Sequence, residues 1–285
     1  MKIFTPILLL FLTFSTVAFS QISDIEKNAL IDLYNSTNGE NWNNSWDLTK
    51  DISTWHGVTV KNNVVVELNL SMNNLEGTLP STIGNLNSLT NLNLGFNQLH
   101  GTIPTEICKN KSLETIELFM NKLEGELPAN IGEINNLKEL VLFNNLLTGE
   151  LPSSIYNLEK LEILQLSSNK FTGAISKRIG NFKNIEVISF FDNEMYGELP
   201  IEIGKLENLK ELALSNNLFE GTLPSELSNL LKLETLLLNE NKLIGDINFI
   251  IKDLSSLRNV EYNNLMKTPT PIYSNPVSQA RISLK

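Results

Sequence analysis

The residues of this sequence that could take part in catalysis are two histidines, one cysteine and many carboxylates. His56 and His100 stand far apart, and neither belongs to a nucleophile, acid–base or metal-binding motif. Cys108 cannot form an intramolecular disulfide; we interpret it as a small buried residue, the alternatives being a reactive thiol or a bond between chains. We therefore predict that the protein is not an enzyme and has no catalytic residue, no metal ion and no cofactor.

Glutamates recur on segments that have the alternating pattern of strands. Each is followed directly by an apolar residue that suits the core, so the carboxylates are expected to point away from it. Two neighbouring carboxylates could act as an acid–base pair, but a solvated face is the expected outcome. The glutamates concerned are Glu67, Glu117, Glu139 and Glu211.

Another group of residues suits binding rather than reaction. Large apolar side chains stand at strand positions that are expected to face away from the core, and exposed aromatic groups suit both protein contacts and sugar rings. We predict that they form a ligand-binding surface; the alternative is that some fold over the strand edge and shield the sheet. The positions are Phe96, Phe119, Met120, Val141, Phe143, Ile163, Val187 and Phe191.

A repeat of 24 residues must position these side chains. In each of eight copies an asparagine is followed four residues later by a glycine, and in six copies a proline follows seven residues after the asparagine. Such a period predicts a solenoid of stacked coils. The asparagines are Asn73, Asn97, Asn121, Asn145, Asn169, Asn193, Asn217 and Asn241.

The same positions of every copy are apolar, because one repeat cannot bury its apolar side without its neighbours. A buried asparagine amide without partners would cost roughly 1–3 kcal/mol, so we expect the asparagines to bond backbone groups of the turn and of the adjacent coil. The glycine is expected at a turn with positive φ, and the proline in a non-helical segment. The apolar rows run from Leu68 to Leu236, Leu70 to Leu238, Leu79 to Ile247, Ile83 to Ile251 and Leu89 to Leu257.

The pattern N-x-L-x-G-x-L/I-P-x-x-I-G-x-L-x-x-L resembles the plant-type leucine-rich repeat of receptor-like kinases and polygalacturonase inhibitors. The resemblance covers about residues 64 to 264. It implies an α/β repeat solenoid, a right-handed superhelix with a parallel sheet on its concave side. For function it implies recognition, since such repeats are mostly scaffolds for binding.

Residues 21–63 are expected to cap the first coil, with 64–265 forming the repeats. Asp24 begins the pattern of an N-capped amphipathic helix, and Gly57–Val60 with Val64–Val66 predicts a hairpin around residues 61–63. The segment resembles the amino-terminal cap of such proteins without its usual cysteine pair. The tryptophans are expected to be buried against the first coil, or alternatively to form a sugar site: Trp42, Trp46 and Trp55.

Both ends of the chain carry features of an exported protein. Residues 1–20 have the apolar run and small-x-small ending of a signal peptide, with cleavage expected before Gln21 and no later membrane-spanning segment. Leu265 replaces the expected asparagine, and residues 266–285 are expected to be a linker and tail. The tail segment Ile272–Ser278 resembles the start of the type IX secretion sorting domain of Bacteroidetes, in truncated form; the alternative is a chance Asn-Pro turn.

The net charge of −10 repels the phosphates of nucleic acid, so we predict no nucleic-acid partner. We therefore predict a secreted or cell-surface recognition module that binds an extracellular protein or a polysaccharide on its concave face. The alternative is a structural surface protein, an adhesin or a binder of ordered water such as ice, which uses the repeat frame without a discrete ligand site.

Overall fold

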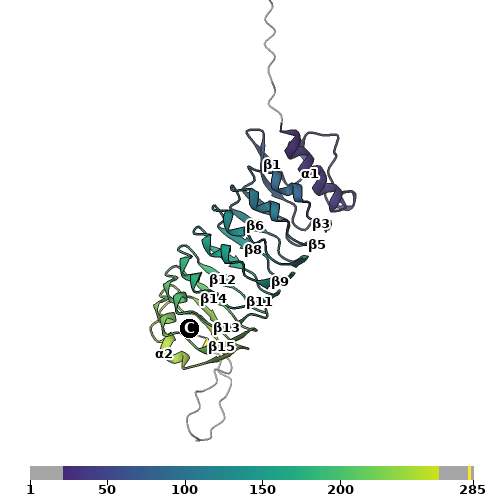
Figure 1. Cartoon of the computed structure of the whole chain (residues 1–285). Coiled ribbons are helices and arrows are strands. Elements are labelled where there is room, and N and C mark those ends of the chain that lie inside the picture. The colour runs from purple at the N-terminus through teal and green to yellow at the C-terminus, as the bar shows by residue number, and fades with distance from the viewer. Residues whose placement is uncertain (1–21, 263–281, 284–285) are drawn as a thin grey trace, which may run out of the picture.

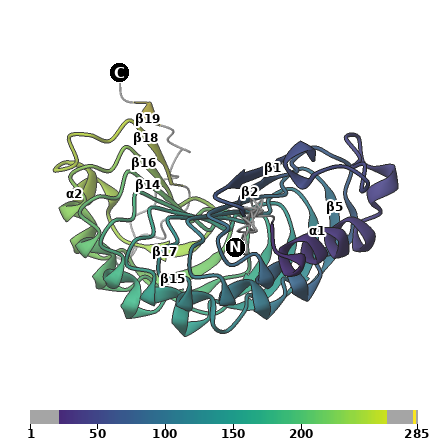
Figure 2. The same ribbon diagram turned by 90° about the horizontal axis from the view of Figure 1, so that it is seen from above.

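The computed structural model describes residues 22–262 and 282–283, over which the chain forms a curved stack of coils (Figure 1, Figure 2). The stack runs from helix α1 (Asp24–Ser36) to the short helix α2 (Ile247–Ile251). The predicted repeat solenoid is confirmed. The expected leader, Leu265 and the sorting-domain-like segment Ile272–Ser278 lie outside the described residues.

One sheet lines the inner, concave side of the curve, with the helical turns on the outside (Figure 2). From β2 to β18 its strands are parallel, and each pairs with the next in the same register, as Leu164 does with Ile188. In order across the sheet, the strands are β1 (Val58–Lys61), β2 (Val64–Asn69), β4 (Asn91–Asn93), β6 (Thr115–Glu117), β8 (Glu139–Val141), β10 (Ile163–Gln165), β12 (Val187–Ser189), β14 (Glu211–Ala213), β16 (Thr235–Leu237), β18 (Asn259–Glu261) and β19 (Ile282–Ser283).

After each concave strand the chain turns and forms a short strand of a second surface. These strands are also parallel, and they form two further sheets. The first contains β3 (Glu76–Thr78), β5 (Gln98–Gly101), β7 (Lys122–Gly125), β9 (Leu146–Glu150) and β11 (Lys170–Thr172). The second contains β13 (Tyr196–Glu198), β15 (Leu218–Thr222) and β17 (Lys242–Ile244).

The return path of each coil is one turn of 3₁₀ helix, which differs from the expected non-helical segment. The carbonyl of Pro80 accepts a hydrogen bond from the N–H of Ile83, so the proline stands where the chain enters the turn. At α2 the turn becomes α-helical, and Ile250 is buried there while Ile251 is only half-buried, unlike in the predicted row. The 3₁₀ helices of the coils are η3 (Ser81–Asn85), η4 (Thr105–Lys109), η5 (Ile131–Glu133), η6 (Ser153–Asn157), η7 (Lys177–Asn181), η8 (Ile201–Lys205) and η9 (Ser225–Asn229).

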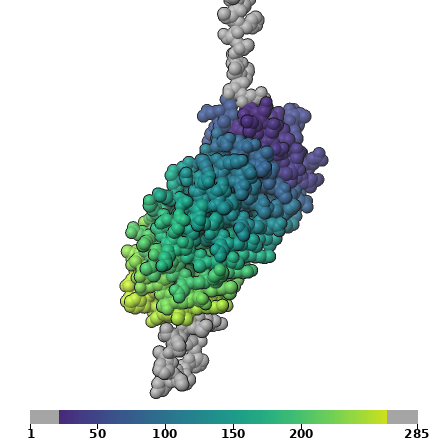
Figure 3. Space-filling view, in the orientation of Figure 1, coloured from purple at the N-terminus to yellow at the C-terminus, as the bar shows by residue number. Residues whose placement is uncertain are grey.

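A single apolar core runs through the coils, and the space-filling view shows a continuous body from the cap to the last coils (Figure 3). The rows that begin at Leu68, Leu70 and Leu89 are buried along the stack, as predicted. Of the row that begins at Leu79, Leu151 is half-buried. The core therefore extends through the stack without a break.

The recurring asparagines form a hydrogen-bonded ladder along the ends of the concave strands. The Nδ2 of Asn145 donates to the carbonyls of Leu118 and Leu142, both at 3.0 Å. Its Oδ1 accepts from the N–H of Leu123 at 3.0 Å. The side chain thus joins its own turn to the preceding coil, as predicted, whereas the buried Nδ2 of Asn73, in the first repeat, has no hydrogen-bond partner among the described residues.

The amino-terminal cap has the predicted helix and hairpin, with shifts at their ends. Ser23, and not Asp24, caps α1, because its hydroxyl accepts from the N–H of Glu26 at 3.2 Å. The hairpin turns at Asn62 and Asn63, which both have positive φ, so Lys61 still belongs to β1. The cap also contains the 3₁₀ helices η1 (Gly39–Asn41) and η2 (Ile52–Thr54).

The three tryptophans of the cap are buried and have satisfied N–H groups. Trp42 donates to the carbonyl of Thr37 at 2.8 Å, and Trp46 donates to that of His56 at 2.9 Å. Trp46 and Trp55 are stacked with ring centroids 4.7 Å apart. Burial is therefore the correct interpretation, and the sugar-site alternative was wrong.

At the other end, β18 continues the parallel sheet, and β19 pairs with it in the antiparallel direction. Leu257 and Val260 are buried, so a further coil begins after the last ladder asparagine, as expected. The backbone of β19 covers the edge that β18 would otherwise expose.

Candidate binding site on the concave sheet

Three of the predicted binding residues contact one another just after the ends of β4, β6 and β8, and a fourth follows in the chain. The rings of Phe96 and Phe119 contact edge to face, with centroids 5.2 Å apart and an interplanar angle of 84°. Phe119 and Phe143 are stacked, at 4.8 Å and 15°. Met120 stands in the coil after Phe96 at the same repeat position, and both are exposed. Phe96, Phe119, Met120 and Phe143 are called the aromatic strip below.

A glycine allows Phe119 to lie flat against the sheet. A Cβ atom on Gly95 would stand 2.7 Å from the Phe119 ring, closer than side-chain contacts allow. Phe119 is half-buried there, and Phe143, which stacks on it, is also half-buried. The predicted alternative, in which such rings shield the sheet, therefore holds for part of each ring, while the rest faces solvent.

The outer members of the strip occupy a backbone conformation that does not suit them. Phe96 and Met120 have φ of 54° and 51°, in the left-handed region, which costs a bulky residue about 1–2 kcal/mol. They remain 45% and 37% exposed, so each is only partly buried in this unfavourable conformation. At the same position a later coil has Asn144, a residue type that tolerates this conformation better.

The strip continues into the first coil through Met72, which was not among the predicted site residues. Met72 is 69% exposed and has a φ of 55°. A shallow open depression of about 390 Å³ lies beside it, lined by Met72, Phe96, Asn97 and Gln98 together with Asn43 and Asn74. The signal for Met72 was its place directly before a ladder asparagine, which it shares with Phe96.

The other predicted residues lie apart from the strip. Ile163 and Val187 are direct neighbours in the sheet but stand at the starts of β10 and β12. Phe191 is exposed, with Ser167 between it and Phe143 in the same row. Val141 is only 6% exposed, so the expectation that it presents a concave binding surface was wrong.

Two concave glutamates are held in partly desolvated surroundings. Burial raises the pKa of Glu117, repulsion from Glu139 raises it further, and a hydrogen bond from Asn93 acts in the opposite direction. That bond joins Asn93 Nδ2 to Glu117 Oε2 at 2.6 Å. Burial also raises the pKa of Glu211. These carboxylates are therefore more costly to ionise than ordinary surface groups.

The residues considered for catalysis do not come together. His56 and His100 are exposed, and Cys108 is buried, which raises the pKa of its thiol to about 12. Within residues 22–262 and 282–283, no three His, Cys, Asp or Glu side chains are grouped so that they could hold a metal ion. In the same described part, no helix has the length and apolar character needed to cross a membrane.

The repeats match a known family model. The model named Leucine Rich Repeat matches residues 65–86, 88–110, 136–158, 160–182 and 208–230. The chain therefore carries leucine-rich repeats and has the corresponding solenoid fold. No curated protein matches it.

Several solved structures are similar to the chain. One is the leucine-rich-repeat ectodomain of the plant membrane receptor kinase GASSHO1/SCHENGEN3 from Arabidopsis thaliana, in complex with CASPARIAN STRIP INTEGRITY FACTOR 2. The TM-score is 0.79 at 31% identity, over 85% of this chain and 29% of that chain. For the structure of PEPR1–AtPEP1 the TM-score is 0.74 at 30% identity, over 84% and 35%. The chain thus spans about a third of these two structures.

A third similar structure is a plant ice-binding protein. It has a TM-score of 0.74 at 25% identity, and the match covers 85% of this chain and 81% of that chain. The fold is therefore shared by proteins with ligands of different kinds.

Proposed function

We propose that the protein is a secreted or cell-surface recognition module that binds an extracellular protein or polysaccharide through its concave face. The observation that carries this proposal is the aromatic strip. Its three phenylalanine rings contact one another in series, and Phe96 and Met120 are exposed in a backbone conformation that is unfavourable for their type. Unfavourable local choices that persist on a surface are typical of binding sites.

The size of the strip is consistent with recognition. Neighbouring strands of a sheet are about 4.8 Å apart, so aromatic groups on three consecutive coils provide a continuous apolar surface. Aromatic and methionine side chains are enriched in protein–protein interfaces. The complex of the Arabidopsis receptor ectodomain with CASPARIAN STRIP INTEGRITY FACTOR 2 supports a protein or peptide ligand.

The test is capture of extracellular proteins and glycan-array binding by the chain and by a Phe119→Ser/Phe143→Ser variant. We expect the chain to capture a ligand and the variant to lose at least about tenfold in affinity, since each such truncation typically costs 1–2 kcal/mol or more at a hot spot. Circular dichroism and melting temperature check that the variant is folded.

A matched control is the Tyr196→Ser/Leu218→Ser variant. These two side chains are also exposed and are direct neighbours, on β13 and β15 of the second surface. The control should bind as the unmodified chain does. Equal binding by all three proteins would overturn the proposed site.

A second candidate function, the binding of ordered water, is favoured by the similarity to a plant ice-binding protein. A measurement of ice recrystallisation and thermal hysteresis decides between the two. Strong inhibition of ice growth that is unchanged in the Phe119→Ser/Phe143→Ser variant would favour the repeat frame as the active surface. No effect on ice growth, together with ligand capture, would favour recognition.

Export is the remaining part of the proposal. It rests on the apolar run of residues 1–20 and on the similarity of the repeats to receptor ectodomains. Mass spectrometry of the protein from the culture medium should give an amino terminus at Gln21. Recovery of the chain only inside cells, with residues 1–20 intact, would contradict export.

A further inference from the structure

The concave face is acidic and lacks cations, and this charge pattern bears on the kind of ligand. Its outward positions form four rows that begin at Glu67, Asn69, Ser71 and Met72 and repeat every 24 residues. Within residues 67–261 no lysine, arginine or histidine stands in any of these rows. The acidic residues of the rows are Glu67, Glu117, Glu139, Asp192, Glu211, Glu240 and Glu261.

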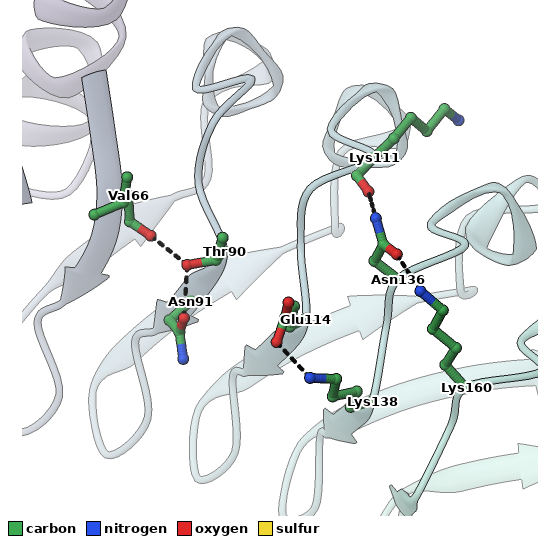
Figure 4. Close-up of polar contacts among 8 residues, drawn as sticks. All are labelled: Val66, Thr90, Asn91, Lys111, Glu114, Asn136, Lys138 and Lys160. Atoms are coloured by element: carbon green, nitrogen blue, oxygen red, sulfur yellow. Dashed lines mark hydrogen bonds and ion pairs between the residues drawn. The ribbon is translucent and has the colours of Figure 1, made fainter. Parts of the chain in front are cut away.

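Lysines do stand beside the face, along the edge where the concave strands begin, but they contact other groups there (Figure 4). Lys138 Nζ lies 2.7 Å from Glu114 Oε2, and Lys160 Nζ donates to Asn136 Oδ1 at 2.7 Å (Figure 4). Among the ion pairs of the described residues, none includes Glu117 or Glu139. Neither carboxylate therefore forms an ion pair within the described residues, although the charge of Lys138, which is paired with Glu114, also acts on Glu139.

The unpaired carboxylates stand next to the aromatic strip. Glu117 and Phe119 are two residues apart on one extended segment, so they project from the same face at a spacing of about 6.5 Å. Glu139 belongs to the neighbouring strand, opposite Thr115, and its charge acts on Glu117. An acidic position and an apolar position thus lie side by side over β6 and β8.

An extended peptide has the same geometry. Its side chains i and i+2 project from one side at about 6.5 Å, the spacing between the acidic position and the strip. A lysine or arginine at one of these positions would meet the carboxylates while an apolar side chain two residues away lies on the rings. The cation would also gain from the nearby aromatic faces.

On the basis of the proposed binding function, we propose that the concave face recognises an extended basic peptide. In this peptide a lysine or arginine stands two residues from an aromatic or large aliphatic side chain. The cation contacts Glu117 and Glu139, and the apolar side chain packs on Phe119 and Phe143. A neutral polysaccharide would leave the half-buried carboxylate of Glu117 without a charge partner.

The test uses three fluorescein-labelled peptides of sequence Gly-Ser-X-Ser-Phe-Ser-X-Ser-Gly, in which X is lysine, glutamine or glutamate. Binding to the full chain is measured by fluorescence anisotropy. We expect the lysine peptide to bind at least about tenfold more tightly than the glutamine peptide, and the glutamate peptide to bind least. About 1 M salt, where the screening length is ~3 Å, should remove most of the difference.

The critical variant is Glu117→Gln/Glu139→Gln, which keeps side-chain size and lets residue 117 still accept a hydrogen bond from Asn93. We expect it to lose most of the preference for lysine over glutamine. The matched control is Glu198→Gln/Glu220→Gln, which removes two neighbouring carboxylates from β13 and β15 and should keep the preference.

The outcomes separate this inference from the function on which it rests. Equal binding of the lysine and glutamine peptides would overturn the basic-peptide specificity. If Phe119→Ser/Phe143→Ser then bound neither peptide, the aromatic strip would still be a binding site. An unchanged preference in Glu117→Gln/Glu139→Gln would also overturn it. Binding of no peptide overturns the inference, while capture of a polysaccharide in the array would still support the proposed function.

Discussion

At the scale of single residues, the position directly before each ladder asparagine separates structure from function. In each of the eight repeats from Met72 to Glu240 the residue there is left-handed, and Asn144 and Asn216 are suited to it. Met72, Phe96 and Met120 are not, and they are exposed. Because these three side chains are exposed at a position that does not suit them, we assign them to the proposed binding surface.

The substitution Met72→Asn should therefore stabilise the protein. We expect an increase of about 0.5–1 kcal/mol in the free energy of unfolding, because asparagine tolerates the left-handed conformation and little buried area is lost. Urea denaturation measures the change. The reverse substitution Asn144→Met is the matched control and should destabilise by a similar amount; a loss of stability in Met72→Asn would contradict the argument.

Ionisation of Glu117 should lower the stability of the fold as the pH rises, whereas ionisation of a salt-bridged carboxylate raises it. Its pKa is raised in the folded state, so the folded protein binds this proton more tightly than the unfolded chain does. The stability that this proton contributes is present below the ordinary glutamate pKa of 4.5 and is lost as the pH rises through the raised value.

Glu117→Gln should consequently melt about 1–2 °C higher than the unmodified chain at pH 7, the effect being limited because solvent screens a half-exposed group. The difference should shrink as the pH falls below 4.5. Calorimetry at pH 4 and pH 7 measures both values. A variant that melts lower at pH 7 would show that the carboxylate stabilises the fold.

At the scale of the structural elements, the repeat made most of the fold predictable. Periodicity places Leu68 and Leu92 in equivalent surroundings, so one correct interpretation applies to every coil. The elements that occur once were less predictable: the cap of α1 shifted to Ser23, and α2 replaced a 3₁₀ turn. A sequence pattern that occurs only once cannot be checked against the same pattern in another repeat.

The same reasoning applies to the candidate site. The alternation of strands identified the outward-facing row of Phe119 and Phe143, which the structure brings into contact. It did not reveal that Val141 is buried or that Gly95 makes room for a ring, because these depend on packing across coils. The rows of a face follow from the sequence, whereas the exposure within each row depends on neighbouring side chains.

Substitutions in the asparagine ladder should destabilise the solenoid strongly. Asn145→Ala removes three hydrogen bonds and leaves the backbone groups of Leu118, Leu123 and Leu142 without that partner. We expect a loss of about 2–3 kcal/mol, as unsatisfied buried groups cost 1–3 kcal/mol. Chemical denaturation measures it. Asn87→Ala, at an exposed site, is the control, and similar losses in both variants would contradict a special role of the ladder.

At the scale of the whole molecule, the solenoid combines a constant frame with a variable concave face. The core, the ladder and the helical turns are nearly the same in every coil, while the concave rows differ from coil to coil. Each coil packs mainly on its two neighbours, so a substitution on the concave face has effects that stay local. The concave sheet is curved and runs across all the coils (Figure 2), which suits the elongated ligand proposed above.

The constant register of the ladder has a consequence for the ancestry of such a surface. Because each coil joins the next through the same contacts, duplication of one 24-residue unit inserts a coil without disturbing the joints on either side. A copy of the unit that carries Phe119 and Met120 would add one more ring to the row and lengthen it by about 4.8 Å. Each such duplication thus lengthens the surface by one coil, and point mutations can then change the exposed side chains of the new coil separately.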